Sequence, residues 1–125
     1  MIQEHIGINV EEPRAMADWY CRHLSMTIVK DTGGALFIAD QSGHGVLEIY
    51  NNPSADIPDY ANTDPLIFHI AFVSKDVDAD EAKLIEAGAT KYKETIIEDG
   101  NMISILRDPW GLAIQLAKRA EPFMK

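Results

Sequence analysis

The alternation of hydrophobic and polar residues over 2–10 predicts a β-strand with Ile6 and Ile8 on one face and His5 and Gly7 on the other. After this strand, hydrophobic residues recur at every third or fourth position, which is typical of a helix with one buried face. Three short runs with the two-residue period of strands follow, separated by turn-forming residues. The first half of the chain is therefore predicted to have the order β, α, β, β, β.

The second half repeats this order after a connector, 51–65, that is rich in proline and aspartate. The tripeptide His5-Ile6-Gly7 returns 64 residues later as His69-Ile70-Ala71. We interpret this as a tandem duplication of a unit too small to close a good core alone. The expected strands cover residues 2–10, 27–31, 36–40, 46–50, 66–73, 91–97, 102–107 and 112–117, and the expected helices run from 13 to about 24 and from about 79 to 87.

Cap and turn residues support these boundaries. Pro13 suits the first position of the first helix. In the second helix, Asp78 and Glu81 have the spacing of a capping box, and Gly88 is expected to end the helix. Asp99-Gly100 is expected to form a hairpin turn. We expect one domain over 1–125, with a first module at about 1–50 and a second at about 66–120.

Composition and charge narrow the classes of function. With 46% hydrophobic residues the chain can fold as a globular domain. A formal charge of −9, from 11 basic and 20 acidic residues, repels a phosphate backbone, so nucleic acid is not an expected partner. No hydrophobic run is long enough to cross a membrane, and the first residues do not resemble a signal peptide. We expect a cytoplasmic protein.

Four polar residues on predicted strands are the candidates for chemistry. Alternation places each of them on the face opposite the hydrophobic side chains that pack against helices. Small neighbours, such as Gly7 and Ala71, leave room beside them. Imidazole, carboxylate and amide groups can all bind a divalent ion, so the pattern predicts a metal site. The four residues are His5, Glu48, His69 and Gln115.

These positions resemble the pattern of the vicinal oxygen chelate superfamily, which includes glyoxalase I, extradiol dioxygenases, methylmalonyl-CoA epimerase and bleomycin-resistance proteins. Members carry a His or Gln on the first strand of each βαβββ module and a Glu or Gln on its last strand. The turn Asp108-Pro109-Trp110-Gly111 also resembles the family's Asp-Pro-x-Gly turn. The resemblance covers nearly the whole chain. It implies an α+β fold in which two modules form an open, eight-stranded mixed-sheet cup around a metal, usually in a homodimer.

One position departs from this pattern. Glyoxalase-like and epimerase members usually carry a Glu at the place of Gln115, where it acts as ligand and base. An amide can coordinate a metal but cannot accept a proton near neutral pH, so Glu48 is the expected catalytic base. Two imidazoles, one carboxylate and one amide leave a divalent ion with a net charge of +1, which favours anionic ligands. Such donors suit Zn²⁺, Ni²⁺, Co²⁺, Fe²⁺ or Mn²⁺.

Two classes of function follow from the resemblance. The first is a metal-dependent lyase or isomerase of the glyoxalase type, acting on a small substrate with vicinal oxygens through an enediolate-like intermediate. The second is a non-catalytic small-molecule binding protein of the bleomycin-resistance type, for which four metal-competent residues would be unnecessary. An extradiol dioxygenase is a third option, although the resemblance would then require a carboxylate at position 115. The site could lie within one chain or be shared across a dimer.

Overall fold

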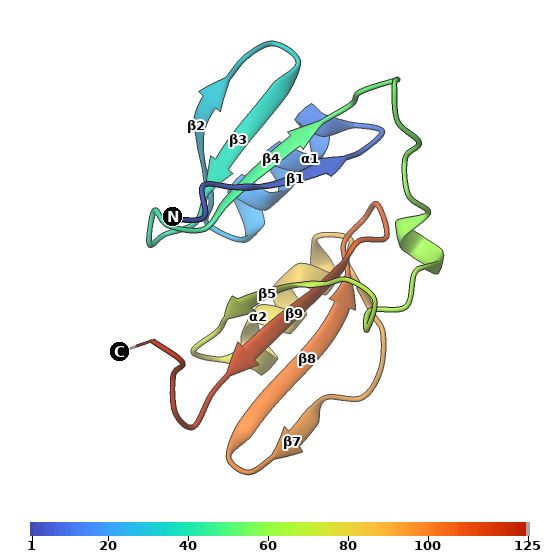
Figure 1. The fold of residues 1–125 in the computed structure, drawn as a ribbon. Coiled ribbons are helices and arrows are strands. Elements are labelled where there is room, and N and C mark those ends of the chain that lie inside the picture. The colour runs from blue at the N-terminus through green and yellow to red at the C-terminus, as the bar shows by residue number, and fades with distance from the viewer. Residues whose placement is uncertain (125) are drawn as a thin grey trace. The chain divides into compact units, whose positions relative to one another are not determined.

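The computed structural model describes residues 1–124, and they form two compact units, one spanning Met1–Pro58 and one beginning at Asp59. Each unit contains one mixed β-sheet and one α-helix, and the helix covers one face of its own sheet (Figure 1). The α+β class predicted from the sequence is confirmed. Neither helix is long and apolar enough to cross a membrane.

The first unit has a four-stranded sheet in the order β1-β4-β3-β2. The first and last strands of the βαβββ repeat are parallel neighbours, and the remaining pairs are antiparallel. This arrangement requires the crossover helix α1 between β1 and β2, as parallel strands cannot be joined by a tight turn. The elements are β1 (Ile6–Asn9), α1 (Pro13–His23), β2 (Thr27–Asp31), β3 (Ala35–Ala39) and β4 (Val46–Tyr50).

The core of the first unit lies between α1 and the sheet. Met16 and Tyr20, one turn apart on α1, are fully buried, and Ile38 and Ile49 are fully buried on the strands. Burying a side chain of this size stabilises the fold by about 1.5–3 kcal/mol. Polar residues at the alternate strand positions are thereby left on the opposite, open face of the sheet.

The second unit repeats this topology with five strands. Its sheet has the order β5-β9-β8-β6, with β7 also paired to β8, and β5 runs parallel to β9. Helix α2 contacts β8 and β9. The elements are the 3₁₀ helix η1 (Tyr60–Asn62), β5 (Ile70–Val73), α2 (Val77–Glu86), β6 (Thr90–Lys91), β7 (Ile96–Glu98), β8 (Asn101–Arg107) and β9 (Ala113–Lys118).

The single strand predicted over 91–97 is wrong, because the structure divides it into β6 and β7. The Lys91 ammonium donates hydrogen bonds to Thr95 Oγ1 at 2.6 Å and to the Glu81 carboxylate of α2. These contacts draw the chain out of the ladder between the two strands. Both short strands still pair with β8.

The start of the second helix also differs from the prediction. Asp76, not Asp78, caps α2, because its side chain accepts a hydrogen bond from the Ala79 backbone N–H at 3.1 Å. The predicted capping box of Asp78 and Glu81 is therefore wrong, and α2 begins at Val77. The predicted stop is confirmed, because Gly88 has the positive φ of 109° that suits a helix end.

Two predicted strands begin later in the structure than in the sequence pattern. The first strand begins at Ile6 and not at Ile2. Before β5, the Asp64 side chain accepts a hydrogen bond from the Leu66 N–H at 2.9 Å, and the chain turns there until β5 begins at Ile70. The predicted hairpin turn is confirmed, since Asp99 and Gly100 have φ of 52° and 78°.

The connector is held at both of its ends. In the first unit, the Asn9 amide donates hydrogen bonds to the carbonyls of Asn52 and Ala55, each at 3.1 Å. In the second unit, the Arg107 guanidinium donates to the carbonyls of Tyr60 and Thr63, each at 2.9 Å. The connector has no regular ladder of backbone hydrogen bonds, and the side chains of Asn9 and Arg107 hold it in place instead.

Candidate functional site

The same strand register occurs in both units. Gly7 is paired with Glu48 across the parallel strands of the first unit, and Ala71 is paired with Gln115 across those of the second unit. Each predicted histidine stands two residues before this pairing position. The oxygen-bearing side chain in each unit is half-buried, while its neighbours Ile49 and Ile114 on the helix-covered face are fully buried.

In the first unit, the structure brings His5 and Glu48 together. His5 Nε2 lies 3.6 Å from Glu48 Oε1, and the two side chains are 32% and 24% exposed. The edge of the Phe37 ring packs against the His5 ring with centroids 5.3 Å apart, so the imidazole is held over β3. No Lys or Arg among residues 1–124 forms an ion pair with Glu48.

Hydrogen bonds at Nδ1 orient both histidine rings. His69 Nδ1 lies 2.7 Å from the Pro65 carbonyl oxygen, which can only accept. The neutral ring therefore carries its proton on Nδ1 and leaves a lone pair on Nε2. His5 Nδ1 lies 2.9 Å from the Glu4 carboxylate, which favours the same tautomer. Histidines that bind metals are commonly oriented by such an Nδ1–H hydrogen bond to a carbonyl or a carboxylate.

The four predicted residues are divided between the units, with two in each. His5 and Glu48 approach each other directly. His69 and Gln115 belong to the second unit, where β9 carries Gln115 beside the strand that follows His69. Within either unit, no three His, Cys, Asp or Glu side chains of residues 1–124 gather in an arrangement that could hold a metal ion.

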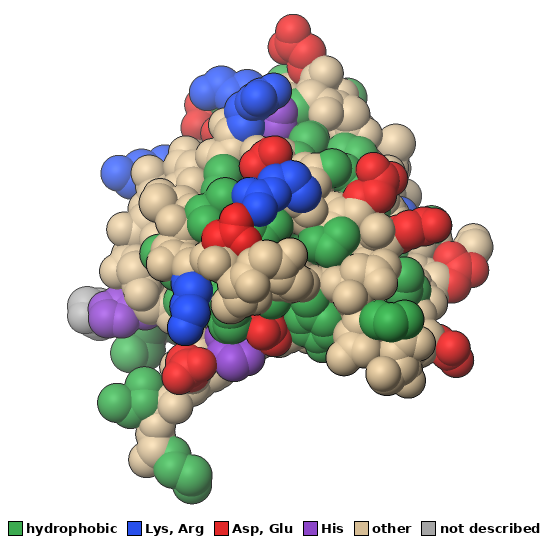
Figure 2. Space-filling view, turned by 90° about the horizontal axis from the view of Figure 1, so that it is seen from above, with side chains coloured by type: hydrophobic (Ala, Val, Ile, Leu, Met, Phe, Trp, Pro, Cys, Tyr) green, Lys and Arg blue, Asp and Glu red, His purple; other side chains and the backbone are tan. Residues whose placement is uncertain are grey.

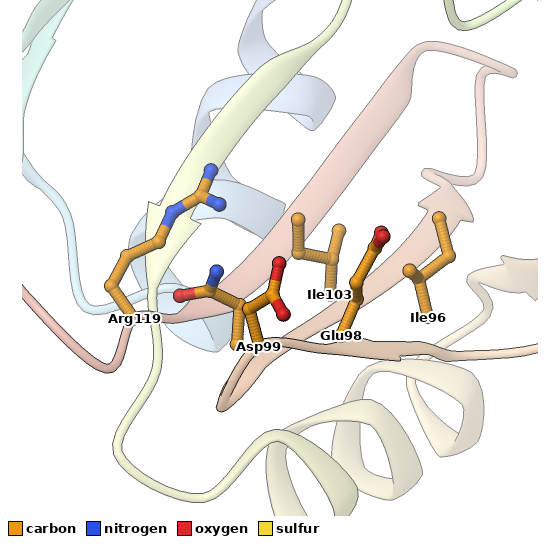
Figure 3. Close-up of a pocket in the computed structure, with 6 residues that line it drawn as sticks. Ile96, Glu98, Asp99, Ile103 and Arg119 are labelled. Atoms are coloured by element: carbon orange, nitrogen blue, oxygen red, sulfur yellow. The ribbon is translucent and has the colours of Figure 1, made fainter.

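A small hollow lies on the open face of the second unit's sheet. Ile103 stands on the same face of β8 as Ile105, which pairs with Gln115, so the hollow and Gln115 share this face. Its volume is about 130 Å³, and Figure 3 shows the Arg119 guanidinium and the Glu98 carboxylate projecting from its edges. The lining residues are Ile96, Glu98, Asp99, Asn101, Ile103 and Arg119.

Sequence reasoning missed this hollow. The sequence does show that Asn101 and Ile103 alternate on one face of β8. This indicates a hollow only once the pairing of β8 with β9 is known. Arg119 forms no ion pair within the part of the chain that the structure describes, and its guanidinium lies 4.8 Å from the centre of the Phe123 ring. A cation held in this way is available to an anionic group on a ligand.

A second polar cluster, also missed, lies under α2 on the helix-covered face. Glu81 accepts hydrogen bonds from Lys91 and from the fully buried Ser104, the latter at 2.5 Å. Burial raises the pKa of Glu81, but the hydrogen bonds from Lys91 and Ser104 outweigh this effect and hold the pKa below its ordinary value. The groups satisfy one another away from the open face, so the cluster joins α2 to the sheet.

The Asp108–Gly111 turn has a structural role. The Asp108 carboxylate accepts hydrogen bonds from the backbone N–H groups of Trp110 at 2.9 Å and Leu112 at 3.0 Å. Gly111 has a φ of 95°, and a Cβ there would lie 2.6 Å from Ala61 Cα. Glycine is required here because the turn packs directly against η1.

Charged side chains are distributed over the visible surface. Figure 2 shows acidic side chains scattered among basic and hydrophobic ones, without a continuous basic patch on that face. A patch of Lys and Arg is the usual electrostatic footprint of a nucleic-acid-binding protein. The whole chain carries a formal charge of −9.

Comparisons with solved structures show the fold. A glyoxalase family protein from Bacillus cereus has a TM-score of 0.78 at 16% identity, over 94% of this chain and 93% of that chain. A glyoxalase/bleomycin resistance protein from Albidiferax ferrireducens T118 has a TM-score of 0.69 at 20% identity, over 94% and 98%. An antibiotic-binding protein from Streptomyces sp. CB03234 has a TM-score of 0.69 at 21% identity, over 93% and 96%.

The sequence identifies the family directly. No curated protein is similar enough to this chain to count as a match. The family model described as Glyoxalase/Bleomycin resistance protein/Dioxygenase superfamily matches residues 2–116. This span covers most of both units and contains all four predicted metal ligands. The chain therefore belongs to the glyoxalase/bleomycin resistance protein/dioxygenase superfamily.

Proposed function

We propose that the protein is a divalent-metal-dependent lyase or isomerase acting on a small substrate with vicinal oxygens. The proposed ligands are His5, Glu48, His69 and Gln115. The observation that carries the proposal is the matched orientation of the two histidines, whose Nδ1 atoms are both engaged by hydrogen-bond acceptors. Each ring can then offer its Nε2 lone pair to a metal.

The donor pair in the first unit fits a metal ion. Ligand atoms about 2.1 Å from a tetrahedral ion are separated by about 3.4 Å. His5 Nε2 and Glu48 Oε1 are 3.6 Å apart, just beyond ordinary hydrogen-bond length. Glu48 is half-buried without a Lys or Arg partner among residues 1–124, so a cation would offset the cost of its burial. Nitrogen and oxygen donors suit Zn²⁺, Ni²⁺, Co²⁺, Fe²⁺ or Mn²⁺.

We assign different parts of the reaction to the side chains of the two units. A bound divalent ion supplies Lewis acidity to an oxygen of the substrate. Glu48 accepts the proton from the carbon beside a carbonyl, and the electron pair of that C–H bond moves toward the carbonyl oxygen. Gln115 cannot exchange protons, so proton transfer takes place on the Glu48 side. These four ligands would leave a bound divalent ion with a net charge of +1, which would favour an anionic ligand.

The hollow on the same face of the sheet as Gln115 offers surface to a further part of the substrate. Ile96 and Ile103 provide apolar surface, and Arg119 provides a cation without a carboxylate partner among residues 1–124. A volume of about 130 Å³ accommodates only a small organic group. We therefore propose a small substrate that carries vicinal oxygens.

Metal content is the first test. Purified protein loaded with Zn²⁺ or Ni²⁺ and then desalted should retain about one ion per chain by elemental analysis. His5→Ala and His69→Ala should each lower this content severalfold, because each removes a nitrogen ligand. His44→Ala is the matched control, as His44 lies in an exposed turn. A wild-type protein without a stoichiometric ion would remove the basis of the proposal.

Proton transfer is the second part of the same experiment. Hydroxyacetone in D₂O, followed by NMR, should lose the protons beside its carbonyl faster with metal-loaded protein than without protein. Glu48→Gln should retain part of the metal and abolish the acceleration. Glu11→Gln, a change at an exposed position of the same unit, should leave exchange unchanged. Full exchange in Glu48→Gln would assign the base to another residue.

A non-catalytic binding protein of the bleomycin-resistance type is the second candidate. The structural likeness to the antibiotic-binding protein from Streptomyces favours it, as does the charge of −9, which would attract a cationic compound. Metal-free protein would then bind a cationic aromatic compound with unchanged affinity in His5→Ala and His69→Ala. The lyase or isomerase proposal instead requires ligand binding to depend on both histidines.

A further inference from the structure

The hollow in the second unit carries opposite charges at its two edges. Figure 3 shows the Arg119 guanidinium on one side of the hollow and the Glu98 carboxylate on the other. Asp99 adds a second carboxylate to the lining. None of these three side chains forms an ion pair with another of residues 1–124, so their charges are not neutralised by contact within this part of the chain. The hollow therefore offers both a cation and carboxylates to a ligand.

Glu98, Asn101 and Arg119 form a row across the sheet. Glu98 pairs with Asn101 in the hairpin between β7 and β8. Beyond the last residue pair of β8 and β9, the Ala120 N–H donates a hydrogen bond to Asn101 Oδ1 at 3.0 Å, which keeps Arg119 beside Asn101. Neighbouring strands are about 4.8 Å apart, so the backbones of Glu98 and Arg119 are separated by about 10 Å. This spacing leaves room for a small ligand between the two charged groups.

The space between the charged groups is lined by apolar side chains and one amide. Ile96 pairs with Ile103, and each of them stands two residues from a member of the row, on the same face of the sheet. The Asn101 amide uses its oxygen to accept from Ala120, and its N–H groups donate to no other group of residues 1–124. A hydrogen-bond donor therefore stands next to the Arg119 guanidinium.

We propose that the hollow binds an α-amino-acid group, with its carboxylate on Arg119 and its ammonium on Glu98. Asn101 gives the carboxylate a second donor, and Asp99 gives the ammonium a second acceptor. Two charge-assisted hydrogen bonds of about 2.8 Å, with about 3 Å between the charges of an α-amino acid, span about 9 Å. This span is close to the separation of the two outer strands. The hydrocarbon part of the ligand then lies against Ile103.

A ligand with a single charge would suit this hollow less well. An anion would meet Arg119 but also the two carboxylates, and a cation would meet the carboxylates but also the guanidinium. A zwitterion satisfies both edges at once, and its net charge of zero avoids repulsion by the acidic protein. The proposal rests on the proposed function in one respect, since it makes the amino-acid group part of the substrate. Binding of this group does not require the metal.

Three related probes test the proposal on metal-free protein, where no ion can chelate an amino acid. L-Valine carries both charges, isovalerate lacks the ammonium, and isobutylamine lacks the carboxylate. In NMR titrations followed at the amides of Asn101 and Ile103, L-valine should bind about fivefold more tightly than either analogue, the upper value for an ion pair at a partly exposed site. Equal affinities, or no shift of these amides with L-valine, would overturn the proposal.

Charge-removing variants locate the two ends of the ligand. Arg119→Gln should lower L-valine affinity about fivefold without weakening isobutylamine. The double variant Glu98→Gln/Asp99→Asn should lower it similarly without weakening isovalerate, and asparagine tolerates the left-handed backbone at position 99. Arg22→Gln and Glu94→Gln, at exposed positions outside the hollow, are the matched controls. An unchanged preference for L-valine over isobutylamine in Arg119→Gln would contradict the proposal.

Metal content separates the failure of this proposal from the failure of the proposed function. If metal-free protein prefers L-valine but loaded protein retains no ion, the hollow binds the amino-acid group and the proposed function fails. If loaded protein retains an ion and exchanges the protons of hydroxyacetone, but metal-free protein shows no preference for L-valine, the proposed function stands and the inference about the hollow is wrong.

Discussion

Glu81 joins a helix to a sheet through a single carboxylate. Its oxygen accepts hydrogen bonds from Lys91 and Ser104, and its side chain is only 20% exposed. Sequence spacing assigned this residue to a capping box, but the ammonium of Lys91 is a stronger partner than a backbone N–H. A local pattern was therefore overridden by a contact that only the folded chain creates.

Glu81→Gln should destabilise the protein in a pH-dependent way. The pKa of Glu81 is lower in the folded protein than its ordinary value of 4.5, so its charged form stabilises the fold above that pH. The stabilisation is lost as the pH falls through the lowered pKa. In urea unfolding, the substitution should cost about 2 kcal/mol at pH 7 and less at pH 3, which lies below the ordinary pKa of 4.5. Glu86→Gln, at an exposed position of α2, should show little effect at either pH.

The face of the sheet on which Glu48 and Gln115 lie was predictable, because alternate residues of a strand point to opposite faces. Glu48 lies within β4, whereas His5 directly precedes β1, and the structure brings His5 Nε2 and Glu48 Oε1 within 3.6 Å of each other. The Nδ1 contact of His69 was not predictable. It depends on the turn that carries the Pro65 carbonyl back to the ring, at 2.7 Å.

Among the elements, the Asp108–Gly111 turn is constrained both by its own backbone and by its packing. Gly111 has a φ of 95°, and its missing Cβ leaves the space occupied by Ala61 of η1. The motif was recognisable in the sequence, but its packing against the connector was not. The connector has no hydrophobic period from which that contact could be inferred.

Gly111→Ala should destabilise the protein more than a matched glycine substitution. Gly43 also has a positive φ, of 77°, but a Cβ there would meet nothing within 4 Å. Gly43→Ala should cost about 1 kcal/mol, for the left-handed backbone alone. Gly111→Ala should cost at least about 3 kcal/mol, since the clash with Ala61 is added. Equal midpoints in thermal unfolding of the two variants would contradict the packing shown by the structure.

The ends of a strand were predicted well where the strand stops at the end of its hydrogen-bonded ladder. Strands β2 and β4 have the predicted limits, 27–31 and 46–50. Two of the errors occur where a polar side chain forms a hydrogen bond outside the ladder, as Lys91 does between β6 and β7 and Asp64 does before β5. The spacing of hydrophobic residues does not indicate which polar side chains will form hydrogen bonds in place of the ladder.

At the scale of the whole molecule, the two units preserve one register while their sequences differ. The pairing of Gly7 with Glu48 recurs as the pairing of Ala71 with Gln115, although the second unit has an additional strand. The repeated tripeptide and the repeated order of elements were sufficient to predict the duplication. The added strand was not predictable, because it arises from the break after Lys91.

The net charge of −9 should make stability depend on salt. Repulsion among excess acidic groups destabilises a compact chain, and salt screens it. Raising NaCl from about 20 mM to about 500 mM, across which the Debye length falls from about 20 Å to about 4 Å, should raise the Tm by several degrees. Tetramethylammonium chloride, whose cation is too bulky to enter a metal site, should give a similar rise. A constant Tm would show that the charges do not repel appreciably.

The anchoring of the connector limits how the chain can be divided. Asn9 fastens the stretch up to residue 56, and Arg107 fastens the stretch from residue 60. Only the bonds around Pro58 lie between these fastenings, so a protease should make its earliest cut there. A gene split at this point would produce two polypeptides, each of which retains the hydrogen bonds to its own part of the connector, and the folding of each could be followed separately.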